Sequence, residues 1–331
     1  MKNLKVFLEN LEASLPSGLT LNKVLIKELG LNKDAASRRI SGKTPFTYSE
    51  VCVLAKAYNI SLTPAQSSSF HNVVFGYTPF KTKQVDSKYF FENISNLLYK
   101  LNAHHHKLLY HVAPEIPIYH YYNYPLLLNF KLFYWGKYLL NIDYYVKRVF
   151  KDAPSDPQIV EHAQKAYEQF CLIPSVEIWT PQTLQTVLTQ IQFCIETGDF
   201  TNTAEILLVL EELNQLMHRI KQMAEDNNKA FDHDKKMQIP FQLYKMDVNM
   251  NTTSIVAEMD HQKIVLQNFN SINFMSTTQP DFCEESLNWI NNLQSKSSLL
   301  SGAGIIERQK FFNLMFKQLS DFKEQVLKLN L

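Results

Sequence analysis

The sequence predicts a mainly α-helical protein with a small β portion. We expect an α+β fold in which an N-terminal helix-turn-helix bundle precedes a larger helical domain with a short antiparallel β-meander. Of the 331 residues, 45% are apolar and 12% aromatic and only eight are glycine, which is typical of a folded, helix-rich chain. Apolar residues recur at helical spacing over most of the chain, and they alternate clearly with polar residues after residue 236.

The length exceeds the usual size of one hydrophobic core, so more than one domain is expected. The helical pattern is interrupted after Ser61 by serine, proline and glycine residues, and it resumes near residue 86. We therefore expect a small domain at residues 1–66, a linker at 67–83 and an α+β sensor or oligomerisation domain at 84–331.

Four short helices are predicted in the N-terminal domain. Apolar spacing predicts a first helix at residues 3–15. Thr20 and Asn32 are side chains of the kind that cap helix N-termini, and they predict helices at 21–29 and 33–41.

Gly42 ends this third helix, and Thr47 begins a fourth. Glu50 stands three residues after Thr47, which is the spacing of a capping box. The apolar faces of four such helices can share one compact core.

The middle of the chain is predicted to be mostly helical. Alternation within residues 108–122 predicts one or two short strands, broken by Pro114 and Pro117. Helices are expected at residues 86–107, 125–149, 156–172, 181–197 and 202–230. The last two helices meet at Gly198, where we expect an antiparallel hairpin whose leucines offer a dimer surface or pack within the monomer.

The C-terminal part is predicted to contain the β-meander and two closing helices. The strands are expected at residues 239–246, 254–259, 263–269 and 272–275. The helices are expected at residues 280–295 and 304–328.

Several features favour a cytoplasmic protein without a membrane span. Glu9 interrupts the short apolar start, so a signal peptide is not expected. Residues 125–142 approach spanning length, but Lys131 and Lys137 make a buried amphipathic helix the better interpretation. The four cysteines are far apart in sequence, which indicates neither a zinc site nor a disulfide framework.

Positive charge is concentrated at the N-terminus. Residues 1–60 contain nine Lys and Arg against five Asp and Glu, whereas the net charge of the whole chain is only +1. A basic module on a neutral body fits contact with nucleic-acid phosphates through one end of the molecule.

In a helix-turn-helix, the second helix presents its outward side chains to base edges in the DNA major groove. Helix 33–41 has Ala36 on its inner side and Arg38 on its outer side, and arginine can bind guanine O6 and N7 together. Arg38 is therefore the leading base reader, Arg39 lies at the edge, and neighbouring residues are placed to hold phosphates. The predicted DNA-binding residues are Thr20, Asn22, Lys23, Asn32, Lys33, Asp34, Ser37, Arg38, Arg39 and Lys43.

Residues 29–62 resemble the lambda-repressor-like helix-turn-helix domains of the XRE class. Ser37-Arg38, Gly42 and the run Leu54-Ala-Lys-Ala57 lie where that family's pattern places them, and Arg39-Ile40 departs from it. The remainder resembles uncharacterised bacterial regulators with a large C-terminal domain. The resemblance implies a sequence-specific DNA-binding transcriptional regulator, and we expect neither enzymatic activity nor a cofactor. A homodimer on double-stranded DNA is expected, because one such module contacts only a few base pairs. The C-terminal domain allows an unknown small-molecule or peptide effector, which nothing in the sequence identifies.

Two other functions stay open. The bundle can be a protein-interaction adaptor that never touches DNA. His261, Lys263 and Asn268 have the spacing of a phospholipase D-like motif, with Asn268 in place of the expected Asp, which allows a phosphodiesterase or an inactive binding domain.

Three further groups of residues have ordinary structural interpretations. The run His104-His105-His106 cannot converge on one metal ion from a helix, because consecutive side chains point about 100° apart. Asp232-His-Asp234 is expected to be a solvated turn. An aromatic cluster is expected to be core rather than a ligand pocket, and it consists of Tyr119, Tyr121, Tyr122, Tyr124, Phe130, Phe133, Tyr134 and Trp135.

Overall fold

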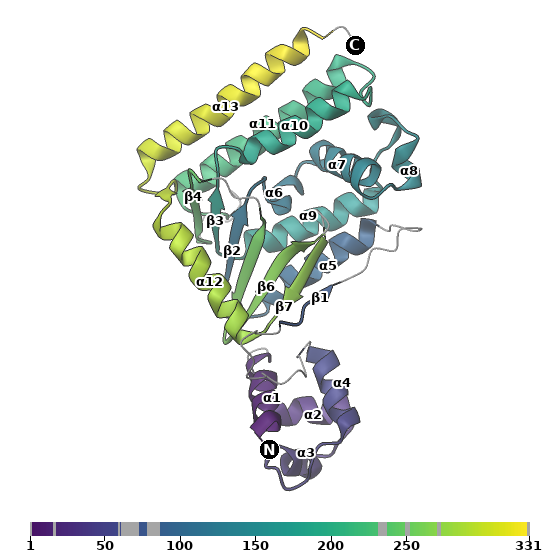
Figure 1. Ribbon diagram of the computed structural model, residues 1–331, viewed down its shortest axis with the longest axis vertical. Helices are drawn as coiled ribbons and strands as arrows, with labels where there is room; N and C mark the ends of the chain where they lie inside the picture. Colours follow the sequence, from purple (N-terminus) through teal and green to yellow (C-terminus); the bar gives the residue numbers. More distant parts are fainter. Residues whose placement is uncertain are drawn as a thin grey trace.

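The computed structural model describes residues 2–15, 18–58, 60, 73–77, 87–230, 237–248, 252–269 and 273–329. Within these residues, thirteen α-helices and eight strands form a mixed α/β fold that is 58% helical and 15% strand (Figure 1). Most of the predicted linker and the run Asp232-His-Asp234 lie outside the described residues. None of the described helices combines the length and the apolar character needed to cross a membrane.

The four N-terminal helices form as predicted, and they are α1 (Lys2–Ala13), α2 (Leu21–Leu29), α3 (Lys33–Ile40) and α4 (Tyr48–Tyr58). The Thr20 hydroxyl accepts a hydrogen bond from the Lys23 amide at 3.4 Å, and Asn32 Oδ1 accepts one from the Ala35 amide at 2.8 Å. The capping box is also confirmed, because the Thr47 amide donates to Glu50 Oε2 at 2.8 Å and the Glu50 amide donates to Thr47 Oγ1 at 3.2 Å.

These helices share a hydrophobic core of their own. Leu11, Val24, Leu25, Ala36 and Leu54 are completely buried in it, and among the described residues no member of this core lies beyond Ile60. The positions of α2 and α3 therefore depend on packing within the bundle.

The rest of the chain is built on one mixed sheet. Its strand order is β1 (Gly76–Tyr77), β7 (Asn273–Thr277), β6 (Gln262–Phe269), β5 (Ser254–Met259), β2 (Lys107–Ala113), β3 (Ser175–Trp179), β4 (Phe241–Lys245) and β8 (Ser298–Leu299). Strands β2, β3 and β4 are parallel, and the other pairings are antiparallel.

Helices cover both faces of this sheet (Figure 1). One face packs against α5 (Ser87–Asn102) and α9 (Pro157–Cys171) through a core that includes Leu109 and Ile255. The other face packs against α12 (Pro280–Ser295) through a core that includes Val112.

A third group of helices lies at the top of Figure 1. It contains α7 (Pro125–Tyr134), α10 (Thr183–Glu196), α11 (Thr203–Asp226) and α13 (Ile305–Leu327). Of the α11 side chains that the sequence offered as a dimer surface, Leu210, Leu213, Leu216, Met217 and Ile220 are buried here, whereas Leu207 is half-buried and Leu208 is 59% exposed. The five buried side chains are therefore used for packing within the chain.

The prediction of a small antiparallel meander is only partly confirmed. Strands β5, β6 and β7 form it, but β4 pairs with β3 and β8, and the sheet extends to eight strands among the described residues. β4 was wrongly assigned to the meander because its partner strand β3 was not predicted. The five residues of β3 are all buried, so the apolar-polar alternation of a half-exposed strand is absent.

Two other predictions were wrong. Residues 118–122 do not form a strand, because α6 (Ile118–Tyr121) begins directly after Pro117. The expected helix at 125–149 is interrupted by a π-helical turn (Trp135–Leu139) and by Asn141, whose φ of 51° leaves the helical region. Two short helices follow, α8 (Asp143–Val146) and a 3₁₀ turn (Phe150–Asp152).

The aromatic residues after β2 are mainly core, as predicted. Tyr119, Tyr121, Tyr122, Phe130 and Phe133 are buried in two of the hydrophobic clusters.

A group of polar side chains is buried between the sheet and α6. His120 Nε2 lies 3.0 and 3.1 Å from the two carboxylate oxygens of Glu177, and the Trp179 indole donates to Glu177 Oε2 at 2.9 Å. Burial raises the pKa of Glu177, but the interactions with His120, together with the nearby His111 and Lys229, outweigh burial, so the pKa is lowered. His111 lies beside this group, paired in register with Glu177, and burial lowers its pKa to about 4.

We expect His111 to make the fold sensitive to acid. The imidazole has an ordinary pKa of about 6.5 in the unfolded chain, so the unfolded chain binds more protons between about pH 6.5 and 4. The stabilising contribution of neutral His111 is thus complete above about pH 6.5, and it is lost as the pH falls toward 4. The free energy of unfolding, measured with urea, should fall between pH 7 and pH 4.5 in the wild type. In His111→Gln this fall should be smaller by roughly 2–3 kcal/mol.

The exposed His105 provides the matched control for this measurement, and His105→Gln should leave the pH dependence as in the wild type. An unchanged pH dependence in His111→Gln would contradict the role assigned to the buried imidazole.

Candidate nucleic-acid interface

The junction between α2 and α3 is tight because two residues have the conformations it needs. Gly30 ends α2 with a φ of 64°, a left-handed conformation that glycine adopts without strain. Asn32 then begins α3 as its N-cap. Ala36 is fully buried and small, so α3 lies close to the rest of the bundle.

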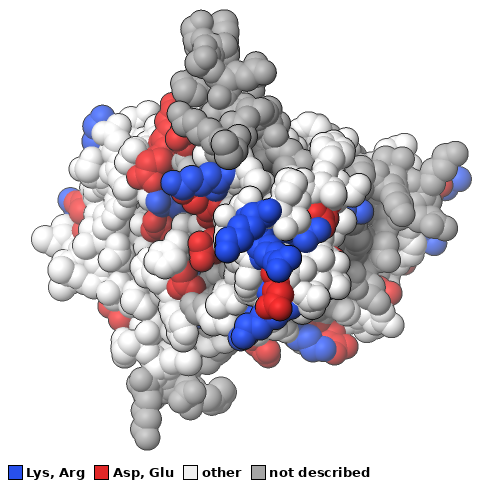
Figure 2. All heavy atoms as spheres, turned by 90° about the horizontal axis from the view of Figure 1, so that it is seen from below, with Lys and Arg blue, Asp and Glu red and all other residues white. Residues whose placement is uncertain are grey.

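The outward face of α3 is polar, as predicted. Lys33, Asp34, Ser37 and Arg38 are all exposed. Figure 2 looks at the molecule from the α3 end, and it shows Lys and Arg side chains gathered near the centre of that face. The predicted base-reading residues therefore share one accessible surface.

The predicted phosphate-binding residues flank this surface. Thr20, Lys23, Asn32 and Lys43 are exposed, and Asn22 is half-buried. Asn22 Nδ2 donates a hydrogen bond to Ser37 Oγ at 2.8 Å, which joins the first turn of α2 to the middle of α3.

The charges of this surface are largely uncompensated. Among the described residues, no carboxylate forms an ion pair with Lys23, Lys33, Arg38 or Lys43. Asp34 is the acidic member of the predicted set. The surface can therefore attract a polyanion, and Arg38 keeps its planar donor group available.

Arg39 differs from its neighbour. Its Nη2 lies 2.7 Å from Glu50 Oε1, and the two side chains are only 16% and 17% exposed. Hydrogen bonding to Arg39 is the main reason why the pKa of Glu50 is lowered. Arg39 thus joins α3 to the capping box of α4, a structural role that the sequence analysis missed because the partners are eleven residues apart and on different helices.

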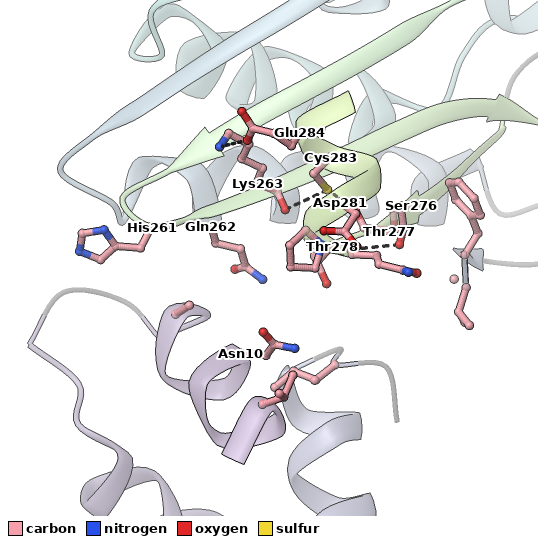
Figure 3. Close-up of a pocket in the computed structure, with 18 residues that line it drawn as sticks. Asn10, His261, Gln262, Lys263, Ser276, Thr277, Thr278, Asp281, Cys283 and Glu284 are labelled. Carbon is pink, nitrogen blue, oxygen red and sulfur yellow. Dashed lines mark hydrogen bonds and ion pairs between the residues drawn. The ribbon is translucent and has the colours of Figure 1, made fainter. Parts of the chain in front are cut away.

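A second region with polar residues is the cavity of about 470 Å³ between α1 and the β6–β7 part of the sheet (Figure 3). It contains two residues of the phospholipase D-like pattern, His261 and Lys263. The Lys263 amine lies 2.8 Å from Glu284, whereas His261 lies apart from this pair in Figure 3. Asp281 adds another carboxylate to the wall. Because Lys263 is paired with Glu284 and no hydrogen bond or ion pair joins it to His261, the described residues do not form a catalytic pair there.

The histidine run forms a polar turn after α5. His104 Nδ1 lies 2.9 Å from Asp260 Oδ2, and the His106 amide donates to Asp260 Oδ1 at 2.9 Å. Within the described part of the chain, no group of three His, Cys, Asp or Glu residues is arranged to hold a metal ion.

Comparison with protein-family models, with curated proteins and with solved structures found no match for the chain. Its function is therefore inferred from its own residues and their geometry.

The neighbouring arginines of α3 give a matched pair of variants. Arg39→Ala should loosen the contact between α3 and α4, because it removes a charge-assisted hydrogen bond worth about 1–2 kcal/mol. Arg38→Ala should leave the bundle unchanged, because Arg38 forms no ion pair among the described residues. Hydrogen-deuterium exchange of the α3 and α4 amides measures the difference, and equal protection in both variants would contradict it.

Proposed function

We propose that the chain is a sequence-specific DNA-binding transcriptional regulator, in which α2 and α3 form a helix-turn-helix and α3 enters the major groove. The observation that carries the proposal is the outward face of α3, where Lys33, Ser37 and Arg38 are exposed. Lys23 and Lys43 flank this face, and no described carboxylate pairs with either.

The dimensions of α3 suit this role. An α-helix with its side chains is about 10–12 Å across, which matches the width of the major groove, about 12 Å, and α3 is a regular helix of eight residues. Arg38 can donate two hydrogen bonds to guanine O6 and N7, while the N-terminal amides of α3 face a phosphate. Thr20, Asn22 and Lys23 at the start of α2 are in position to hold the adjacent backbone.

The resemblance of residues 29–62 to the XRE class supports the same proposal. The chain departs from that family at Arg39-Ile40, and at this position Arg39 forms an ion pair with Glu50. The base-reading set of this chain is therefore centred on Arg38 and excludes Arg39.

We further propose that the protein acts on DNA as a homodimer and that the α/β body senses an effector or holds the two copies together. One short recognition helix contacts only a few base pairs, and two half-sites about one helical turn apart supply the missing specificity.

Selection of bound duplexes from a random DNA library tests the proposal directly. The full-length protein should enrich one motif, and Arg38→Ala should relax one position of it at a cost of about 1–3 kcal/mol. A motif with two-fold symmetry is expected from a dimer. Folded protein that enriches no motif at low salt would overturn DNA reading and favour the protein-interaction adaptor.

The phosphate contacts make a separate prediction about salt. Lys43→Gln should weaken binding to all duplexes alike, and it should reduce the slope of log affinity against log salt by about 0.9 without changing the motif. Fluorescence anisotropy over about 50–200 mM salt measures this slope. Lys317→Gln, an exposed change on α13, is the control, and an equal effect there would exclude a specific role for Lys43.

A further inference from the structure

An open groove of about 610 Å³ lies at the amino ends of the parallel strands β2, β3 and β4. Lys107 and Ser175 begin β2 and β3, Pro240 directly precedes β4, and all three line the groove. The turn after α5 provides another wall. This volume is within the usual range of small-molecule sites.

The groove is mainly apolar and carries positive charge at one side. Leu108, Leu172, Val176 and Ile239 are among its apolar lining residues. Lys107 is the charged side chain of the lining, His105 and His106 adjoin it, and no Asp or Glu belongs to the described residues that line the groove. The larger share of the surface thus favours a hydrocarbon, and the charged side favours an anion.

Lys107 has no acidic partner. Its Nζ donates a hydrogen bond to the Asn102 carbonyl at 3.4 Å, and no carboxylate pairs with it among the described residues. Partial burial lowers its pKa, which shows that the amine is partly removed from water. A bound anion would restore the lost electrostatic stabilisation.

A hydrogen-bond donor lies on the same side of the sheet. Ser175 is 1% exposed, and its hydroxyl has no hydrogen-bond partner within the described chain. Leu109 is paired in register with Ser175, and Lys107 shares the face of Leu109 because side chains alternate along a strand. The amine and the hydroxyl therefore stand on one face of adjacent strands.

We propose that this groove binds an amphipathic carboxylate, whose apolar body lies against the strand starts and whose carboxylate is held by Lys107. The proposal does not depend on DNA binding, since the groove and α3 are in separate parts of the molecule and have no residue in common.

Fluorescence titration with dansylaminoundecanoate, followed by displacement with dodecanoate, tests the site in the full-length protein. Both carboxylates should bind, and dodecanol and dodecyltrimethylammonium should bind at least about tenfold more weakly because they lack the anion. Lys107→Met should weaken dodecanoate by about tenfold, while Lys107→Arg should retain most of the affinity.

Two variants separate loss of the site from loss of the fold. Gln242→Glu adds a negative charge to the lining with little change of shape, and it should also weaken dodecanoate. Arg38→Ala should leave dodecanoate binding unchanged, so a failure of the DNA-binding proposal has no effect on this test.

The proposal is overturned if dodecanoate does not bind below its micelle concentration, or if Lys107→Met binds it as tightly as the wild type. Sedimentation with phosphatidylglycerol vesicles distinguishes the source of the ligand. Binding to vesicles without binding to monomeric dodecanoate would assign the surface to a membrane and would also overturn the proposal.

Discussion

The buried carboxylate of Glu177 is the constraint on which the body of this protein depends. A carboxylate in the middle of a fully buried strand is tolerated only when it is paired and hydrogen-bonded, and His120 and Trp179 supply those partners. His120 belongs to α6, so α6 must lie on this face of the sheet. The chain therefore turns into a helix directly after β2, and the ring of Phe170 on α9 packs against His120 with a centroid distance of 5.3 Å. The contact between Glu177 and His120 thus connects β3 to α6, the helix that follows β2 in the chain.

Features with local causes could be predicted from the sequence. The N-caps Thr20 and Asn32 and the capping box of Thr47 and Glu50 each act within four residues, so the helices they begin were located closely. The long helices α12 and α13 were also predicted, because an amphipathic pattern repeats over many turns. Local sequence patterns did not predict strand β3. It is short and buried on both faces, and its one signal is a run with β-branched and aromatic residues between Pro174 and Pro181.

The candidate DNA-binding face shows the same division between local and distant causes. Helical periodicity predicted which side of α3 is exposed, and Arg38 lies on that side. It did not predict that Arg39 is held by Glu50, since that contact depends on the packing of α3 against α4. Two adjacent arginines therefore have different roles, one available for a ligand and one structural. A basic residue in a motif is a candidate contact only when its tertiary partners leave it available.

The topology also explains why the open groove lies at the amino ends of the parallel strands. Ligands of open α/β sheets usually bind beyond the carboxyl ends. In this chain those ends are closed. Thr183 at the start of α10 donates a hydrogen bond to the Ala113 carbonyl at 3.0 Å, and Trp179 at the end of β3 is buried in the core that α7, α10 and α11 share. At the amino ends, Ser175 is buried, but Lys107 and Leu108 are only half-buried and line the open groove. The accessible surface of the parallel strands is consequently their amino ends, where an amine without an acidic partner lies beside apolar walls.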